Sequence, residues 1–122
     1  MKALDLAIFL LDAEFTNRQL NKHYERHQEE FKGMSKQQYA ERAKAATERK
    51  LTKGDIRYNR KDGSKALYNL NTGELTIWYP KNNTIATHFL PKFDKDKKTQ
   101  NLKASKEYVR KDMQKNGLKP NF

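Results

Sequence analysis

The sequence predicts an α+β fold, in which N-terminal helices pack on a twisted antiparallel four-stranded sheet that is followed by a C-terminal helix. Two observations predict it. Residues 16–50 repeat apolar side chains at helical spacing, whereas residues 54–91 form short apolar runs separated by turn sequences. A helical period returns after residue 101. The helices and the sheet are expected to form one pair of layers around a core.

The 122 residues are enough for one domain with a modest core, but not for two. We divide this domain into a helical part (1–53), an antiparallel sheet (54–91), and a basic loop with a helix (92–122). Only 35% of the residues are hydrophobic, but one Trp, six Tyr and six Phe supply bulky core material. The absence of cysteine excludes disulfides and thiolate metal sites.

The first apolar run, over residues 4–11, is too short to span a membrane and is interrupted by Asp5. It also lacks the small-residue cleavage site of a signal peptide. We therefore expect no membrane partner. The run is expected to form an amphipathic helix with Leu4, Ile8 and Leu11 facing the core.

Two helices are predicted next, over residues 16–32 and 35–50. Each begins with a capping box, a Thr or Ser followed three residues later by Gln, which satisfies free N–H groups of the first turn. Gly33 and Gly54 stand where these helices are expected to end. The side chains that share one face are Leu20, Tyr24, His27 and Phe31 in the first helix, and Tyr39, Ala43 and Ala46 in the second.

Four strands are predicted in the middle of the chain, and the turns between them contain Asp-Gly, Asn-Thr-Gly or Asn-Asn. Such turns join antiparallel neighbours, so the strands form a meander. A charged loop and a last helix follow, with Val109 and Met113 facing inward. The predicted strands cover residues 56–59, 65–70, 74–79 and 84–90, the loop covers 93–100, and the helix covers 102–116 and stops at Gly117.

Positive charge dominates the chain, with 26 Lys and Arg against 15 Asp and Glu, a formal net charge of +11. It is concentrated in two segments. Residues 42–65 include nine basic and three acidic residues, and residues 92–119 include ten basic and four acidic residues. Such segments with aromatic residues between them favour nucleic-acid binding, because phosphates supply most of the non-specific affinity. They lack the opposing apolar face of a membrane-surface helix.

Two histidines, His23 and His27, lie four residues apart and therefore one helical turn apart, with about 6 Å between their Cβ atoms. Three interpretations are open. The pair is structural, it binds zinc with His88 as a third imidazole, or at least one ring transfers protons. Cleavage of RNA by its own 2′-hydroxyl needs a base, an acid and cations, but no cofactor or metal. Hydroxyls such as those of Thr87 or Tyr68 are suited to donate hydrogen bonds to the phosphate.

The order of several short motifs resembles a known family. His23-x-x-x-His27 is followed by Glu30-Phe31, then by Tyr39 with Ala43, and the sheet continues with Arg57-Tyr58, Asp62-Gly63, Tyr68-Asn69 and residues 85–91, Ile-Ala-Thr-His-Phe-Leu-Pro. Over residues 20–91 the chain resembles the C-terminal toxin domains of contact-dependent growth inhibition and related polymorphic toxins. Within them it is similar to the colicin D-like branch of the barnase/EndoU/colicin/RelE ribonuclease superfamily.

The resemblance implies a bacterial toxin ribonuclease that cleaves tRNA by transesterification, leaving a 2′,3′-cyclic phosphate and a 5′-hydroxyl. It implies that His23 is the catalytic imidazole, with His27 assisting, and that Thr87 lies at the phosphate. Arg57 and Lys65 are the candidates for steadying the transition state. The residues expected to contact the rest of the substrate are Tyr68, His88, Phe89 and Lys50.

Thr87 and His88 are adjacent in the last predicted strand, so their side chains point to opposite faces. We expect Thr87 and Phe89 to line the site, and His88 would join them only if a β-bulge re-aimed it. Tyr68 is either a core aromatic or a phosphate contact. Trp78 either stacks on a base or is buried under a helix.

A toxin of this kind implies an acidic immunity protein as its partner, because complementary charge speeds association. It also implies action in the cytoplasm of a target bacterium, after delivery as the C-terminal part of a secreted or cell-surface protein. Whether a host activating factor is needed stays open. Two alternatives remain: a non-enzymatic, basic nucleic-acid-binding module, and a zinc-dependent DNase toxin.

Overall fold

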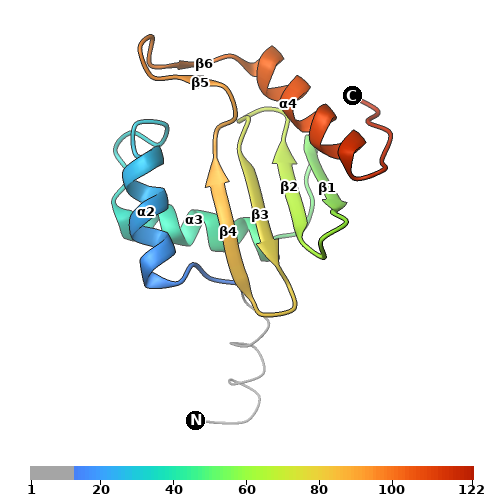
Figure 1. Ribbon diagram of the computed structural model, residues 1–122. Helices are drawn as coiled ribbons and strands as arrows, with labels where there is room; N and C mark the ends of the chain where they lie inside the picture. Colours follow the sequence, from blue (N-terminus) through green and yellow to red (C-terminus); the bar gives the residue numbers. More distant parts are fainter. Residues whose placement is uncertain (1–12) are drawn as a thin grey trace.

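A computed structural model describes residues 13–122 of the chain (Figure 1). The helix predicted over residues 4–11 lies outside the described residues. No helix in the described part is long and apolar enough to cross a membrane. The helices are α2 (Asn17–His27), α3 (Lys36–Glu48) and α4 (Leu102–Lys115), and the strands are β1 (Asp55–Asn59), β2 (Lys65–Asn69), β3 (Leu75–Tyr79), β4 (Thr84–Phe89), β5 (Phe93–Asp94) and β6 (Thr99–Gln100).

The predicted α+β fold is confirmed. Strands β1 to β4 form an antiparallel sheet in chain order, so β1 and β4 are its two edges. Helix α3 crosses one face of the sheet and α4 lies over the other, with α2 beside β4 (Figure 1). The expectation of a single pair of layers is therefore wrong, because the sheet lies between two helical layers.

Burial of β2 on both faces explains the three layers. Three consecutive residues of this strand, Ala66, Leu67 and Tyr68, are all buried, although neighbouring side chains point to opposite faces. Leu67 packs with Ala43 and Ala46 of α3 and with Trp78 and Ile85. Ala66 and Tyr68 pack on the opposite side, in the cluster that holds Val109 and Met113 of α4.

Helix α2 is shorter than the sequence predicts. It begins as expected, with the Thr16 side chain accepting a hydrogen bond from the Gln19 N–H at 3.2 Å. It ends at His27, however. The turns that follow are stabilised by hydrogen bonds from the backbone N–H groups of Glu30 and Phe31, and they lead to Gly33, whose φ is +79°. The capping box at Ser35 forms in full and starts α3.

An irregularity in the β3–β4 pairing decides which side chains of β4 share a face. Ile77 stands opposite Thr87 and Trp78 opposite Ile85, so Ala86 is an extra residue between them. Beyond this bulge the alternation is regular, and Thr87 lies on the α4 face while His88 faces α3. The bulge therefore does not bring His88 to the side of Thr87.

The charged loop predicted over residues 93–100 contains a two-stranded hairpin, β5–β6. This hairpin projects beyond the sheet next to the C-terminal end of α2 (Figure 1). Lys95 Nζ donates a hydrogen bond to the backbone oxygen of Arg26 at 3.1 Å, which ties the hairpin to that helix end.

A polar network is buried between α3 and the β3–β4 pair. His88 Nδ1 lies 2.7 Å from Thr76 Oγ1, and His88 Nε2 lies 3.2 Å from Glu74 Oε2. Arg42 Nε donates to both carboxylate oxygens of Glu74, at 2.8 and 3.0 Å. Burial alone would raise the pKa of Glu74, but the adjacent His88 ring and the hydrogen bonds and charge of Arg42 outweigh it and hold this pKa at about 2.

Replacement of the Glu74 carboxylate should change how stability depends on pH. The folded-state pKa of about 2 lies below the ordinary 4.5, so the carboxylate stabilises the fold fully above pH 4.5 and loses its contribution as the pH falls toward 2. This contribution is about 3 kcal/mol. In urea unfolding at successive pH values, the free energy of unfolding of Glu74→Gln should decrease less steeply at acid pH than that of wild type, which flattens the acid limb of the stability curve. Glu25→Gln, on the exposed face of α2, should leave it unchanged; equal acid limbs in wild type and Glu74→Gln would refute this role.

Candidate active site

The two predicted histidines lie on α2 with their rings stacked, 6.0 Å apart between centroids. His27 Nδ1 lies 2.5 Å from Glu30 Oε2, and the other oxygen of Glu30 accepts the N–H of Leu90 at 2.6 Å. The Glu30 side chain is only 5% exposed. A carboxylate held on Nδ1 places a proton there and leaves Nε2 as the ring nitrogen that can exchange a proton with a ligand. Glu30 therefore sets both the orientation and the tautomer of His27.

His23 has a different environment. Its ring contacts Phe15, with 5.5 Å between centroids, and its Nδ1 is buried without a hydrogen-bond partner in the described part of the chain. Burial, followed by the positive charges near it on α2, lowers the pKa of His23. Its imidazole is therefore neutral at pH 7. Among the described residues His88 Nε2 also lacks a hydrogen bond, but it lies 3.2 Å from the Glu74 carboxylate. Buried polar atoms without any partner cost free energy and are uncommon, which makes the His23 ring a functional candidate.

A row of aromatic rings continues from the histidines onto the sheet and α4. His27 contacts Phe89 with centroids 5.5 Å apart, and Phe89 meets Tyr108 edge-on at 5.9 Å. The Nζ atom of Lys92 lies 6.0 Å from the Tyr108 ring. The expected position of Phe89 at the site is thus consistent with the structure, and Thr87 lies two residues before it on the same half-buried strand face.

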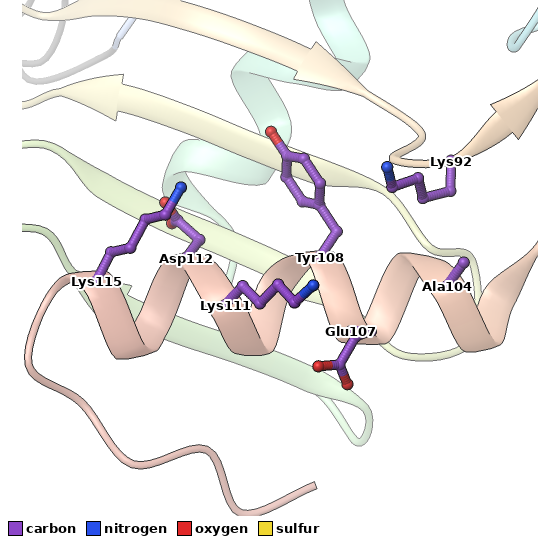
Figure 2. A pocket seen from close by; sticks show the side chains of 7 residues that line it. All are labelled: Lys92, Ala104, Glu107, Tyr108, Lys111, Asp112 and Lys115. Atoms are coloured by element: carbon purple, nitrogen blue, oxygen red, sulfur yellow. The ribbon is translucent and has the colours of Figure 1, made fainter.

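An open pocket of about 310 Å³ lies at the end of this row, along α4 (Figure 2). Two acidic residues line it. Asp112 accepts hydrogen bonds from Tyr58 and Arg60, and Glu107 forms an ion pair with Arg110 at 3.4 Å, so an arginine balances each charge. The side chains that line the pocket are those of Lys92, Ala104, Glu107, Tyr108, Lys111, Asp112 and Lys115.

Two of the expected substrate contacts, Tyr68 and His88, are core residues. Tyr68 is fully buried on the α4 face, and its hydroxyl and Ser105 Oγ are 2.8 Å apart. His88 is 1% exposed and belongs to the Glu74 network. Neither side chain has surface available to a substrate, so both assignments are wrong. Trp78 is also buried, beneath α3.

The three predicted basic residues are not beside the histidines. Arg57 is on β1, at the opposite edge of the sheet from β4, a separation of about 14 Å for three strand spacings. It faces α3, and its guanidinium bonds the backbone oxygen of Arg49, next to exposed Lys50. Lys65 stands opposite Trp78, also on the α3 face. Residues Arg57, Lys65 and Lys50 therefore cannot share a phosphate with His23 and Thr87.

The structure gives roles to residues that the sequence interpretation did not assign to the site. Glu30 had a usable signal, since it lies three residues after His27, but its role depends on the turn that follows α2. Lys92 and Tyr108 are brought to Phe89 by the chain reversals after β4 and β6. Tyr108 precedes the inward-facing Val109 in an amphipathic helix, a position that indicates partial exposure.

No protein-family model matches the chain, and no curated protein matches it. Residues 13–122 contain no group of three or more His, Asp or Glu side chains placed to hold a metal ion.

Removal of the Glu30 carboxylate should change the tautomer of His27. In wild type at pH 8 we expect the proton on Nδ1, because Glu30 accepts it. Glu30→Ala should shift the ring toward the Nε2–H tautomer that free imidazole side chains prefer, and should leave His23 as it is. Long-range ¹H–¹⁵N NMR of the ring nitrogens measures both. The same His27 tautomer in both proteins would rule out control by Glu30.

Proposed function

We propose that the chain is a metal-independent endoribonuclease, in which His23 is the base and His27 the acid of a transesterification. The observation that carries the proposal is the contrast between two stacked imidazoles: one kept neutral by burial, the other paired with a buried carboxylate. Acid–base catalysis needs two such groups whose environments differ.

The reaction follows from these positions. His23 takes the proton of a ribose 2′-hydroxyl, and the 2′-oxygen attacks the adjacent phosphorus. The bond from phosphorus to the 5′-oxygen breaks, and that oxygen receives a proton from the His27 imidazolium, whose charge Glu30 stabilises. The products are a 2′,3′-cyclic phosphate and a 5′-hydroxyl. Lys92, at the Tyr108 end of the row, adds positive charge where the substrate backbone would continue beyond the histidines.

Within this proposal the substrate is tRNA and the chain is a bacterial toxin domain, as the motif order of residues 20–91 implies. The net charge of +11 supports a polyanionic substrate. It equally supports an acidic immunity protein that covers the site. Delivery by a larger secreted or cell-surface protein, and action in the target cytoplasm, belong to the same proposal.

Both histidines should be required for RNA cleavage. Incubation of total tRNA in excess EDTA should give discrete fragments ending in a cyclic phosphate. His23→Ala or His27→Ala should slow their formation about a hundred- to ten-thousand-fold, the usual contribution of one acid or base. Arg57→Ala, at the opposite edge of the sheet, is the control and should cleave at nearly the wild-type rate.

Other outcomes of that experiment point elsewhere. Intact tRNA retained on a native gel would support the non-enzymatic binding module. Fragments that vanish with EDTA would support a metal-dependent nuclease.

A substrate with a good leaving group should separate the two roles. The nitrophenyl ester of uridine 3′-phosphate releases nitrophenolate, which leaves without being protonated. Absorbance measurements should therefore show His27→Ala close to wild type on this ester and His23→Ala still impaired, because the 2′-hydroxyl must lose its proton in either case. Equal impairment of the two variants would contradict the assignment.

A further inference from the structure

Tyr108 differs from the other five tyrosines of the chain. The hydroxyls of Tyr24, Tyr39, Tyr58, Tyr68 and Tyr79 all hydrogen-bond within the protein. With the residues that the structure describes, the Tyr108 hydroxyl forms no such bond, and the side chain is 39% exposed. A tyrosine on the surface with a free hydroxyl is available to a ligand.

The position of Tyr108 is nevertheless well defined. Phe89 packs against the ring at an interplanar angle of 87°, and Figure 2 shows the side chain rising from α4 toward the sheet. Because Phe89 also contacts His27, one phenyl ring separates Tyr108 from the proposed acid. A short single-stranded segment of RNA can therefore contact both residues.

Lysines surround this ring. Lys92 comes from the turn after β4, and Lys111 and Lys115 come from α4 (Figure 2). Lys115 lies near Asp112, but neither Lys92 nor Lys111 forms an ion pair with any residue in 13–122. The Lys92 ammonium is at the outer limit of a cation–π contact with Tyr108. This contact is therefore weak, and the ammonium loses little interaction energy when it moves to contact a ligand.

The Lys92 backbone is held in a conformation that disfavours lysine. Its φ is +61°, in the left-handed region, which costs about 1 kcal/mol for a residue with a Cβ. The turn is anchored on both sides, since Gln100 Nε2 donates to Pro91 O at 3.3 Å and Asn101 N–H donates to Lys92 O. Glycine would fit this backbone better, so it offers a variant that removes the ammonium without disturbing the turn.

We propose that Tyr108, Lys92 and Lys111 bind one unpaired nucleotide of the RNA next to the histidines. The base stacks on the Tyr108 ring, and the flanking phosphates contact the two lysines. This subsite rests on the proposed ribonuclease function and defines its substrate as a single-stranded region, because a base inside a duplex cannot stack on a side chain.

Binding to a short single-stranded RNA with 2′-O-methyl groups tests the subsite without cleavage. By fluorescence anisotropy at fixed salt, Tyr108→Ala should weaken binding about tenfold, the usual contribution of one stacked base. Tyr108→Phe should bind like wild type, because stacking uses the ring and the hydroxyl is free. Leu102→Ala, an equally exposed apolar residue of α4 outside the pocket, is the control and should also be unchanged.

A matched pair of lysine variants separates a specific phosphate contact from general charge. Lys111→Ala and Lys103→Ala each remove one positive charge from α4, but only Lys111 lines the Tyr108 pocket. Lys111→Ala should weaken binding several-fold more than Lys103→Ala. Lys92→Gly should weaken binding while keeping or raising the melting temperature, because it removes backbone strain.

The outcomes distinguish the subsite from the nuclease. Cleavage of tRNA together with unchanged binding by Tyr108→Ala would overturn the subsite and leave the nuclease standing. Binding that depends on Tyr108, in a wild-type protein that cleaves nothing, would support the subsite and overturn the nuclease. An equal loss of RNA-binding affinity in Lys111→Ala and Lys103→Ala would also overturn the subsite.

Discussion

Burial of both faces of the sheet is the constraint on which the rest of the structure depends. Three consecutive apolar residues in β2 need cover on both sides, which α3 and α4 provide through Ala43 and Ala46 on one face and Val109 and Met113 on the other. Helix α2 then lies beside the edge strand β4 (Figure 1). The candidate site forms along β4, where Phe89 contacts His27 of α2 and Tyr108 of α4.

Glu30 connects the fold to the chemistry at this meeting point. One oxygen accepts the N–H of Leu90 just beyond β4, and the other holds Nδ1 of His27. A carboxylate this deeply buried is favourable only when both oxygens have such partners. The interaction that fixes the turn after α2 on the sheet therefore also orients the imidazole, and the stability of this corner cannot be separated from the proposed function.

Local sequence patterns were sufficient to predict the helices and strands, but not to predict which residues form the candidate site. The capping box at Ser35, the turns around Gly63 and Gly73, and the inward positions of Val109 and Met113 depend on nearby residues, and the structure confirms them. Tyr68 and His88 were misassigned because the residue type alone does not show whether a Tyr or a His lies in the core or in a functional site. Only their buried partners, Ser105 and Glu74, distinguish the two cases.

The sequence by itself determined the α+β order, the basic charge and the helical spacing of His23 and His27, because these depend on composition and on contacts within a few residues. The tertiary structure decided the rest. Strand order placed Arg57 at the far edge, the bulge at Ala86 set the faces of Thr87 and His88, and chain reversal brought Tyr108 to Phe89. Each of these depends on contacts between residues that are far apart in the sequence. The free energies of such contacts cannot be predicted from a local sequence pattern.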